Sequence, residues 1–263
     1  MNWWQAIVFG IVQGLTEFLP VSSSGHLLIA EKLMGLSGQD LLTFYSLLHV
    51  GTLAAVLVVM RKDIWAILKN ILGKTTWLLL IATIPAVLFT LVFKDLIDKA
   101  FGGATLGYEF LFTGVLLLAI LLFKSGEKTI EKMTWLDAII AGIGQAVAIL
   151  PAVSRSGACI SALLFRKVKR EDAIRFAFLM SIPAILGSLL LDIKDMLTGT
   201  STITSGMILP VILGVVFSAV SGYAVMRFMI KKLSVKGIAI CGVYVVLLGV
   251  LILVDQNATH ILL

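Results

Sequence analysis

Charged residues are scarce in this chain of 263 residues, because Asp, Glu, Lys and Arg together make up only 14% of it. A water-soluble domain carries about 25% charged residues to cover its surface. Hydrophobic residues reach 59%, and they occur in long runs. The composition therefore excludes a water-soluble globular domain and indicates that much of the surface faces lipid.

Cysteine is also rare, with Cys159 and Cys241 as the only two. Both lie in apolar segments, so we interpret them as small buried hydrophobic residues and not as a disulfide or a metal-binding pair. No basic residue precedes the first apolar stretch, which argues against a secretory signal peptide. Trp3 and Trp4 instead predict an aromatic anchor at the membrane interface.

The formal net charge of +6 does not indicate a nucleic-acid-binding protein. The lysines and arginines lie in short loops between apolar runs, which is typical of the cytoplasmic loops of membrane proteins. We therefore expect this chain to have the membrane, and no nucleic acid, as its partner.

Six segments are apolar and near the roughly 17–25 residues that a transmembrane helix needs. Two other regions, residues 5–33 and 136–165, are interrupted by proline, glycine and serine. Each arm of these regions has about 15 residues and is too short to cross, so we predict two re-entrant hairpins. The six predicted spans are residues 44–60, 77–93, 110–123, 173–191, 207–226 and 238–254.

The two interrupted regions repeat each other at an offset of 132 residues. We therefore predict an all-α polytopic membrane protein with two repeats, residues 1–125 and 130–263, each a hairpin followed by three transmembrane helices. Because three is odd, the second repeat is inverted, and the two hairpin tips meet near the membrane centre. The offset pairs Gly10 with Gly142, Gln13 with Gln145, Ser22 with Ser154, Ser24 with Ser156 and Gly25 with Gly157.

Basic residues are distributed unequally between the two faces that this topology defines. One face holds sixteen lysines and arginines, and the other holds four. An excess of positive charge marks the cytoplasmic side, so we predict that both termini lie outside. The first hairpin then enters the membrane from the outside, and the site between the tips opens outward.

Both hairpin tips carry a proline followed by a Ser-X-Ser-Gly sequence. Serine is a good N-cap, and a helix start gathers free N–H groups with partial positive charge. Two facing helix starts would bind an anion such as phosphate, although serine and glycine also allow close helix packing. We predict substrate-binding roles for Gln13, Thr16, Ser22, Ser24, Gly25, Ser154, Ser156 and Gly157.

Four residues in or beside the tips are candidate catalytic residues. Glu17 stands in an apolar stretch, where an ionisable group is costly and marks a functional site. Arg155 is suited to bind phosphate oxygens in a planar fork or to pair with Glu17, and the two roles are compatible. His26 follows Ser23 by one helical turn, a spacing that suits a nucleophile and its acid–base partner.

Two further ionisable residues carry less specific signals. His49 lies inside a predicted span, where it either lines the cavity or packs as a core histidine. Glu109 stands at the end of a predicted span, and we expect its carboxylate to be solvated.

At these residues the sequence resembles the undecaprenyl-diphosphate phosphatase family, the bacitracin-resistance type. The stretch from Gln13 to His26, QGLTEFLPVSSSGH, resembles the first signature of that family, and the stretch from Pro151 to Cys159, PAVSRSGAC, resembles the second. The second stretch departs at Ala152, where the family usually has glycine, and at Cys159, where it usually has threonine or serine.

The resemblance implies that the protein hydrolyses undecaprenyl diphosphate, a polyprenyl diphosphate lipid, to the monophosphate and phosphate. This reaction recycles the lipid carrier of cell-wall synthesis on the outer face of the bacterial cytoplasmic (inner) membrane. The resemblance also implies a divalent cation, Mg²⁺ or Ca²⁺. Glu17, with Gln13, either holds this cation together with substrate oxygens or orients His26. The resemblance does not decide whether the protein forms a homodimer.

The expected mechanism has Ser23 attack the terminal phosphorus while His26 takes the proton. Arg155 and the two helix starts stabilise the charge on the phosphoryl oxygens. In a competing assignment His26 is the nucleophile and the serines only bind. The alternative of another class is a transporter or flippase of polyprenyl phosphate, which needs the arginine and the helix starts but no nucleophile–base pair.

Overall fold

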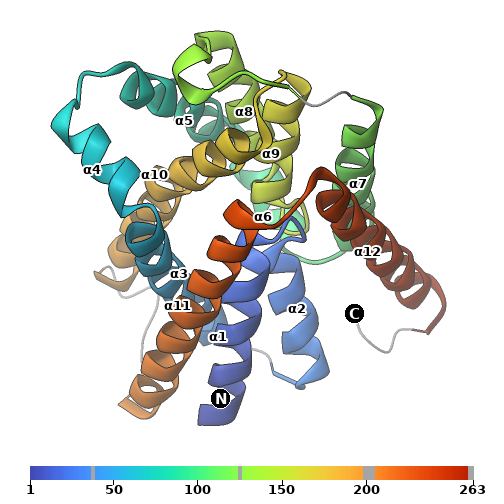
Figure 1. The fold of residues 1–263 in the computed structure, drawn as a ribbon. Coiled ribbons are helices and arrows are strands. Elements are labelled where there is room, and N and C mark those ends of the chain that lie inside the picture. Colours follow the sequence, from blue (N-terminus) through green and yellow to red (C-terminus); the bar gives the residue numbers. More distant parts are fainter. Residues whose placement is uncertain (37–38, 124–125, 198–204, 260–263) are drawn as a thin grey trace.

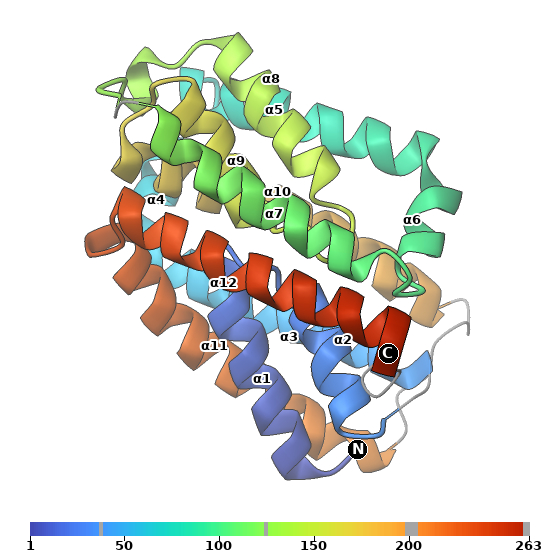
Figure 2. The same ribbon diagram turned by 90° about the vertical axis from the view of Figure 1, so that its right-hand side faces the viewer.

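The computed structural model describes residues 1–36, 39–123, 126–197 and 205–259. Within these ranges the chain is helical, and one isolated bridge between Lys128 and Val168 is the only β-type pairing. Figure 2 shows α7 and α12 lying side by side and running in nearly the same line, whereas Figure 1 shows α10 inclined to them. The predicted all-α class is confirmed.

The α-helices of the described residues follow one another with short connections. In chain order they are α1 (Trp3–Phe18), α2 (Ser23–Leu33), α3 (Gln39–Val59), α4 (Arg61–Lys69), α5 (Lys74–Val92), α6 (Lys94–Ala100), α7 (Leu106–Ala119), α8 (Trp135–Val147), α9 (Arg155–Phe165), α10 (Arg170–Leu197), α11 (Ile208–Lys231) and α12 (Val235–Val254).

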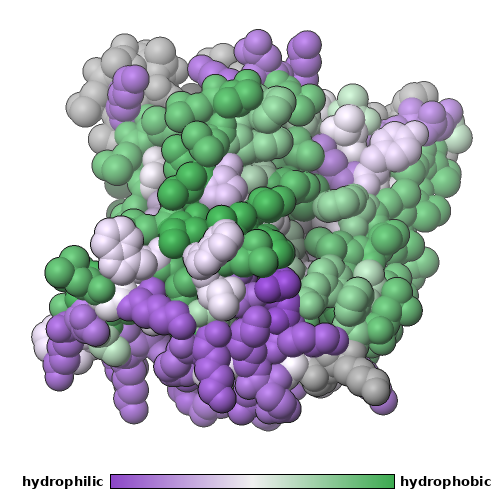
Figure 3. Space-filling model, turned by 90° about the horizontal axis from the view of Figure 1, so that it is seen from above, coloured by the Kyte–Doolittle hydropathy of each residue, from purple (hydrophilic) through white to green (hydrophobic). Residues whose placement is uncertain are grey.

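Four helices of the described residues are long and apolar enough to cross a membrane. They are α5, α10 as far as Leu191, α11, and α12 with the turn that follows it. A fifth span is formed if α3 and α4 count together, although α4 is bent from α3 by 73°. Figure 3 shows a broad hydrophobic surface between hydrophilic residues, which form a dense band along one edge and smaller groups along the opposite edge. The chain is a multi-pass membrane protein.

The two interrupted regions each form a pair of short helices. α1 and α2 have 16 and 11 residues, and α8 and α9 have 13 and 11. At about 1.5 Å per residue, none of them reaches across a hydrocarbon core of about 30 Å. In Figure 1, α1 and α2 run in opposite directions. The inverted relation of the repeats stays a prediction, and residues 124–125 and 260–263 of their ranges lie outside the described residues.

Helices from the two halves of the chain pack against each other. α1 packs on α11, α5 on α8, and α7 on α12. Glycine permits the close approach, because a Cβ at Gly14 would collide with Ser218 and Gly222 of α11. One hydrophobic cluster accordingly includes Phe110 of the first half and Phe178 of the second. A second, smaller cluster around Phe9 and Phe44 has all its buried members in the first half.

Helix α4 lies at the corner where α3 ends, and the span pattern did not anticipate it as a separate helix. Ile64 and Ile67 pack against the core, whereas Trp65 and Leu68 are 60% and 57% exposed. A short helix with an exposed tryptophan and flanking lysines is typical of a segment that lies in the membrane interface.

Candidate active site

The first hairpin tip is a strained turn between α1 and α2. Ser22 caps α2, because its Oγ accepts a hydrogen bond from the Gly25 N–H at 3.4 Å. The backbone of Ser22 has φ of +70°, a left-handed conformation that costs a non-glycine residue about 1–3 kcal/mol. The Ser22 hydroxyl offsets part of this cost by donating to the Pro151 carbonyl oxygen at 2.6 Å. Strain of this kind clusters at functional sites.

The second tip has the same serine cap, with an ordinary extended backbone at Ser154, and touches the first. Ser154 caps α9 by accepting from the Gly157 N–H at 3.1 Å, and its Oγ lies 3.3 Å from Ser156 Oγ. Ser156 Oγ donates to the Leu19 carbonyl at 3.1 Å, and Ser24 Oγ donates to the Pro151 carbonyl. The starts of α2 and α9 therefore lie at one place, as the sequence predicts for the two tips.

Glu17 connects the tips electrostatically. Its Oε2 accepts from Ser23 Oγ at 2.6 Å and from Gln13 Nε2 at 3.2 Å. Its Oε1 forms an ion pair with the guanidinium of Arg155, so the pairing that the sequence left open is present. His49 Nε2 lies 3.7 Å from Oε2, which places this histidine at the site. The carboxylate is only 7% exposed.

His26 lies on α2 one turn after Ser23 but has other hydrogen-bond partners. Its Nδ1 lies 2.6 Å from the Ser22 carbonyl oxygen, and its Nε2 lies 2.8 Å from the Tyr244 hydroxyl. The Tyr244 ring also stacks on the imidazole at a centroid distance of 5.7 Å. Because a carbonyl can only accept, Nδ1 carries the proton and Nε2 is left as an acceptor. Between these two described residues, Ser23 and His26, there is no hydrogen bond.

Helix α7 holds the turn before α9, a role that the sequence did not indicate. Glu109 accepts from the Ala152 N–H at 2.8 Å and from Thr105 Oγ1 at 2.7 Å. Thr113 donates to the Ala152 carbonyl at 3.0 Å and accepts from the Ser154 N–H at 3.1 Å. Glu109 is 7% exposed, so the prediction of a solvated carboxylate is wrong. No sequence signal marked this burial, because the partner of the carboxylate across the fold is a backbone N–H.

The remaining predicted binding residues are engaged within the protein. Thr16 Oγ1 donates to the Val12 carbonyl at 2.6 Å. Gly25 lies against the Phe110 ring and Ala152, where a Cβ would clash with the ring. The hydroxyls of the tip serines satisfy backbone groups, so they fix the turns before any ligand arrives. Substrate contacts for these residues stay predictions.

The donor set for a divalent cation is small. Within the described ranges, no group of three or more His, Cys, Asp or Glu side chains could hold a metal ion. Gln13 Oε1, however, is buried without a hydrogen-bond partner, and Gln13 contacts Glu17. These two side chains offer oxygen ligands of the type that Mg²⁺ and Ca²⁺ prefer, and a bound diphosphate would have to supply others.

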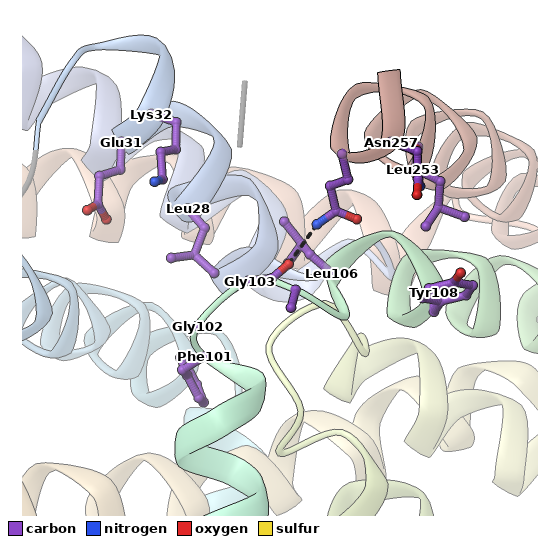
Figure 4. A pocket seen from close by; sticks show the side chains of 12 residues that line it. Leu28, Glu31, Lys32, Phe101, Gly102, Gly103, Leu106, Tyr108, Leu253 and Asn257 are labelled. Carbon is purple, nitrogen blue, oxygen red and sulfur yellow. Dashed lines mark hydrogen bonds between the residues drawn. The ribbon is translucent and has the colours of Figure 1, made fainter. Parts of the chain in front are cut away.

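A cavity of about 590 Å³ opens beside α2 (Figure 4). It lies between the end of α2, the loop before α7 and the turn after α12, where Gln256 Nε2 donates to the Gly103 carbonyl at 2.8 Å. Leu28 and Lys32 line it from α2, and Leu106 lines it from α7. Leu106 is one helical turn from Phe110, which packs edge-on against His26.

Comparison with known proteins agrees with the sequence motifs. The family described as bacitracin resistance protein BacA matches residues 6–251. An undecaprenyl-diphosphatase from Carboxydothermus hydrogenoformans is 45% identical over 259 residues, which cover 98% of this chain and 99% of the relative. An undecaprenyl-diphosphatase 4 from Bacillus thuringiensis is 42% identical over 262 residues, covering 99% and 100%. One from Alcanivorax borkumensis is 38% identical over 265 residues, covering 96% and 98%.

Proposed function

Since this chain belongs to the family of the bacitracin resistance protein BacA, we propose that it is a membrane phosphatase that hydrolyses undecaprenyl diphosphate to undecaprenyl phosphate and phosphate. The observation that carries the proposal is the Ser23 hydroxyl, 2.6 Å from the Glu17 carboxylate, at a place where two helix starts converge. A hydroxyl, a base and an anion-binding site are the parts that phosphoryl transfer requires.

The substrate is expected to bind with its two chemical halves in different surroundings. The prenyl chain lies along the exposed apolar side chains of the bundle, and the diphosphate enters between the tips. The free N–H groups at the starts of α2 and α9 then face phosphate oxygens. Arg155 turns part of its guanidinium from Glu17 to the terminal phosphate, where its fork binds two oxygens. The cavity beside the end of α2 is the side from which we propose that the polar group enters.

In the proposed reaction Ser23 Oγ attacks the terminal phosphorus. The bond from that phosphorus to the bridging oxygen breaks, and undecaprenyl phosphate leaves. The serine proton passes to Glu17, the acceptor to which it is already hydrogen-bonded. Water then hydrolyses the phosphoserine and releases phosphate. This route assigns to Glu17 the proton transfer that the sequence spacing suggested for His26.

His26 has two alternative roles, and experiment can separate them. When its Nε2 lone pair exchanges the Tyr244 hydroxyl for water or substrate, His26 activates the water that hydrolyses the phosphoserine, or it is itself the nucleophile. Arg155 and the helix starts stabilise charge on the transferred phosphoryl oxygens in either case. A divalent cation held by Glu17 and Gln13 would supply further neutralisation of the diphosphate charge.

We also propose a location and an orientation. The protein lies in the bacterial cytoplasmic membrane with both termini and the site opening outside. The support is the gathering of basic residues at one end of the bundle, where Lys74 Nζ reaches the Glu131 carbonyl at 2.7 Å and Arg175 reaches Asp63 at 3.1 Å. Such an end marks the cytoplasmic side.

Phosphate release from undecaprenyl diphosphate by purified protein in detergent tests the function. The assay is run with and without EDTA, beside Ser23→Ala, His26→Ala and Arg155→Ala. Ser188→Ala is the control, because its hydroxyl only bonds the Ile185 carbonyl of its own helix. We expect release that needs the metal, survives in the control and is lost in the three variants. A folded wild-type protein that releases no phosphate with Mg²⁺ or Ca²⁺ would refute the phosphatase.

A further inference from the structure

A smaller cavity lies at the basic end of the bundle, apart from the hairpin tips. It has a volume of about 260 Å³ and is enclosed by the corner of α3 and α4, the start of α10 and the end of α11. Five cationic side chains and one carboxylate line it: Arg61, Lys62, Asp63, Arg175, Arg227 and Lys231. The excess of positive charge predicts an anionic ligand.

The arginines in this cavity are held in place, and the one carboxylate of the lining offsets only part of their charge. Asp63, the carboxylate of the lining, pairs with Arg175 at 3.1 Å. Arg175 Nε is nevertheless buried and has no hydrogen-bond partner, which leaves a donor without an acceptor. Arg227 donates to the Tyr223 hydroxyl at 2.8 Å and lies over that ring at 5.6 Å. Both contacts orient the guanidinium and leave its charge in place.

The cavity opens at the depth of lipid headgroups. Helix α4 forms one wall, and its exposed Trp65 marks the level of the membrane interface. Lys69 lies over the Trp65 ring at 5.7 Å and is not among the residues that line the cavity. Lysines whose only role is to orient the chain in the membrane would not need to line a cavity. Here two pre-oriented guanidinium groups surround a space large enough for a phosphate group.

We propose that this cavity is a second anion site, which binds a phosphate group at the interface through Arg175 and Arg227. The planar forks of two arginines match phosphate oxygens, and the five cationic side chains of the lining exceed the charge of Asp63. The phosphate belongs to the headgroup of an anionic phospholipid or to inorganic phosphate. The site takes no part in hydrolysis at the tips.

Native mass spectrometry of the full-length protein in detergent tests this site. The protein is titrated in separate arms with phosphatidic acid, phosphatidylcholine and inorganic phosphate. Arg227→Gln and Lys62→Gln alter the cavity, whereas Lys69→Gln and Lys236→Gln remove a charge from the same end outside the lining. Thermal unfolding checks that each variant is folded, and phosphate release checks that the tips still work.

We expect phosphatidic acid to bind better than phosphatidylcholine, and each cavity variant to weaken it by about fivefold. The two controls should bind as the wild type does, with hydrolysis unchanged in all four variants. Binding of inorganic phosphate alone, with the same loss in the cavity variants, would support the site and identify free phosphate as its ligand. If Arg227→Gln binds phosphatidic acid and inorganic phosphate as well as Lys69→Gln does, the proposal is overturned.

Discussion

At the scale of single residues, the Glu17 carboxylate has more partners than any other group at the tips. It faces a hydroxyl, an amide, a guanidinium and an imidazole, and it is nearly buried. An ionised carboxylate inside a membrane needs such compensation. The same contacts hold Ser23 and Arg155 in fixed positions before substrate binds, which is the arrangement that catalysis by positioning needs.

Ser23 and Ser24 offer a matched comparison, since they are adjacent in α2 and differ in their partners. Ser23→Ala removes the proposed nucleophile, so phosphate release should fall about a thousandfold or more. Ser24→Ala removes a hydrogen bond to the Pro151 carbonyl, which should lower stability by about 1 kcal/mol and leave most of the activity. Steady-state rates and thermal unfolding measure both. Substantial activity in Ser23→Ala would transfer the nucleophile to His26.

Some features of individual residues followed from the sequence, and others did not. Glu17 and Arg155 could be singled out because charge is rare in apolar segments, and their pairing was one of two stated possibilities. The burial of Glu109 could not be seen, since its partner is a backbone N–H at position 152 that carries no sequence signature. Hydrogen bonds to backbone depend on packing, which residue types do not encode.

At the scale of helices, α7 supports the second tip from outside its own hairpin. Thr113 and Glu109 hold both ends of the turn from Ala152 to Ser154, and Arg155 follows at once. A displacement of this turn would move the guanidinium relative to the phosphate. α7 is therefore a positioning element for the site, although none of its residues is proposed to touch substrate.

Thr113→Val should separate this positioning role from mere stability. The variant leaves the Ser154 N–H without its acceptor, which costs about 1–3 kcal/mol. We expect a lower kcat and a higher KM, because Arg155 loses its fixed position. Thr113→Ser keeps the hydroxyl, so both kinetic constants should return to their wild-type values although the methyl group is missing. Wild-type kinetics in a destabilised Thr113→Val would restrict the residue to a structural role.

Glycine contacts between helices give a second prediction at this scale. Gly14→Ala places a methyl group against the backbone of α11, so α1 must shift, at a cost of about 1–3 kcal/mol. Gly187→Ala on α10 meets no atom within 4 Å and should leave stability unchanged or slightly raised. Thermal unfolding in detergent compares them. Equal midpoints for the two variants would show that the α1–α11 contact is looser than described.

The positions of the long helices could be anticipated from hydropathy, because lipid demands apolar runs of set length. The corner between α3 and α4 could not, since three charged residues at 61–63 end the apolar run and the short apolar stretch at 64–68 does not tell where the chain goes next. The direction of α4 is set by the helix face that packs on the core, and Ile64 and Ile67 make that contact. Hydropathy alone does not distinguish a face on protein from a face on lipid.

At the scale of the whole molecule, the few oxygen ligands at the tips give a prediction for metal removal. Glu17 and Gln13 alone are too few to bind Mg²⁺ or Ca²⁺ tightly. EDTA should therefore abolish phosphate release and leave the thermal midpoint of the substrate-free protein unchanged. A large drop of the midpoint in EDTA would reveal a cation site formed by the protein itself.

The contacts between the tips have a consequence for biosynthesis. The first tip carries Ser23 and Glu17, but the Pro151 carbonyl that receives its serine hydroxyls is made more than a hundred residues later. A ribosome that has completed only the first half has therefore inserted the nucleophile without the arginine or the turn that orders it. The nascent chain stays inert until α9 is inserted. A split at residues 124–125 should give two silent fragments that become active only when they are produced together.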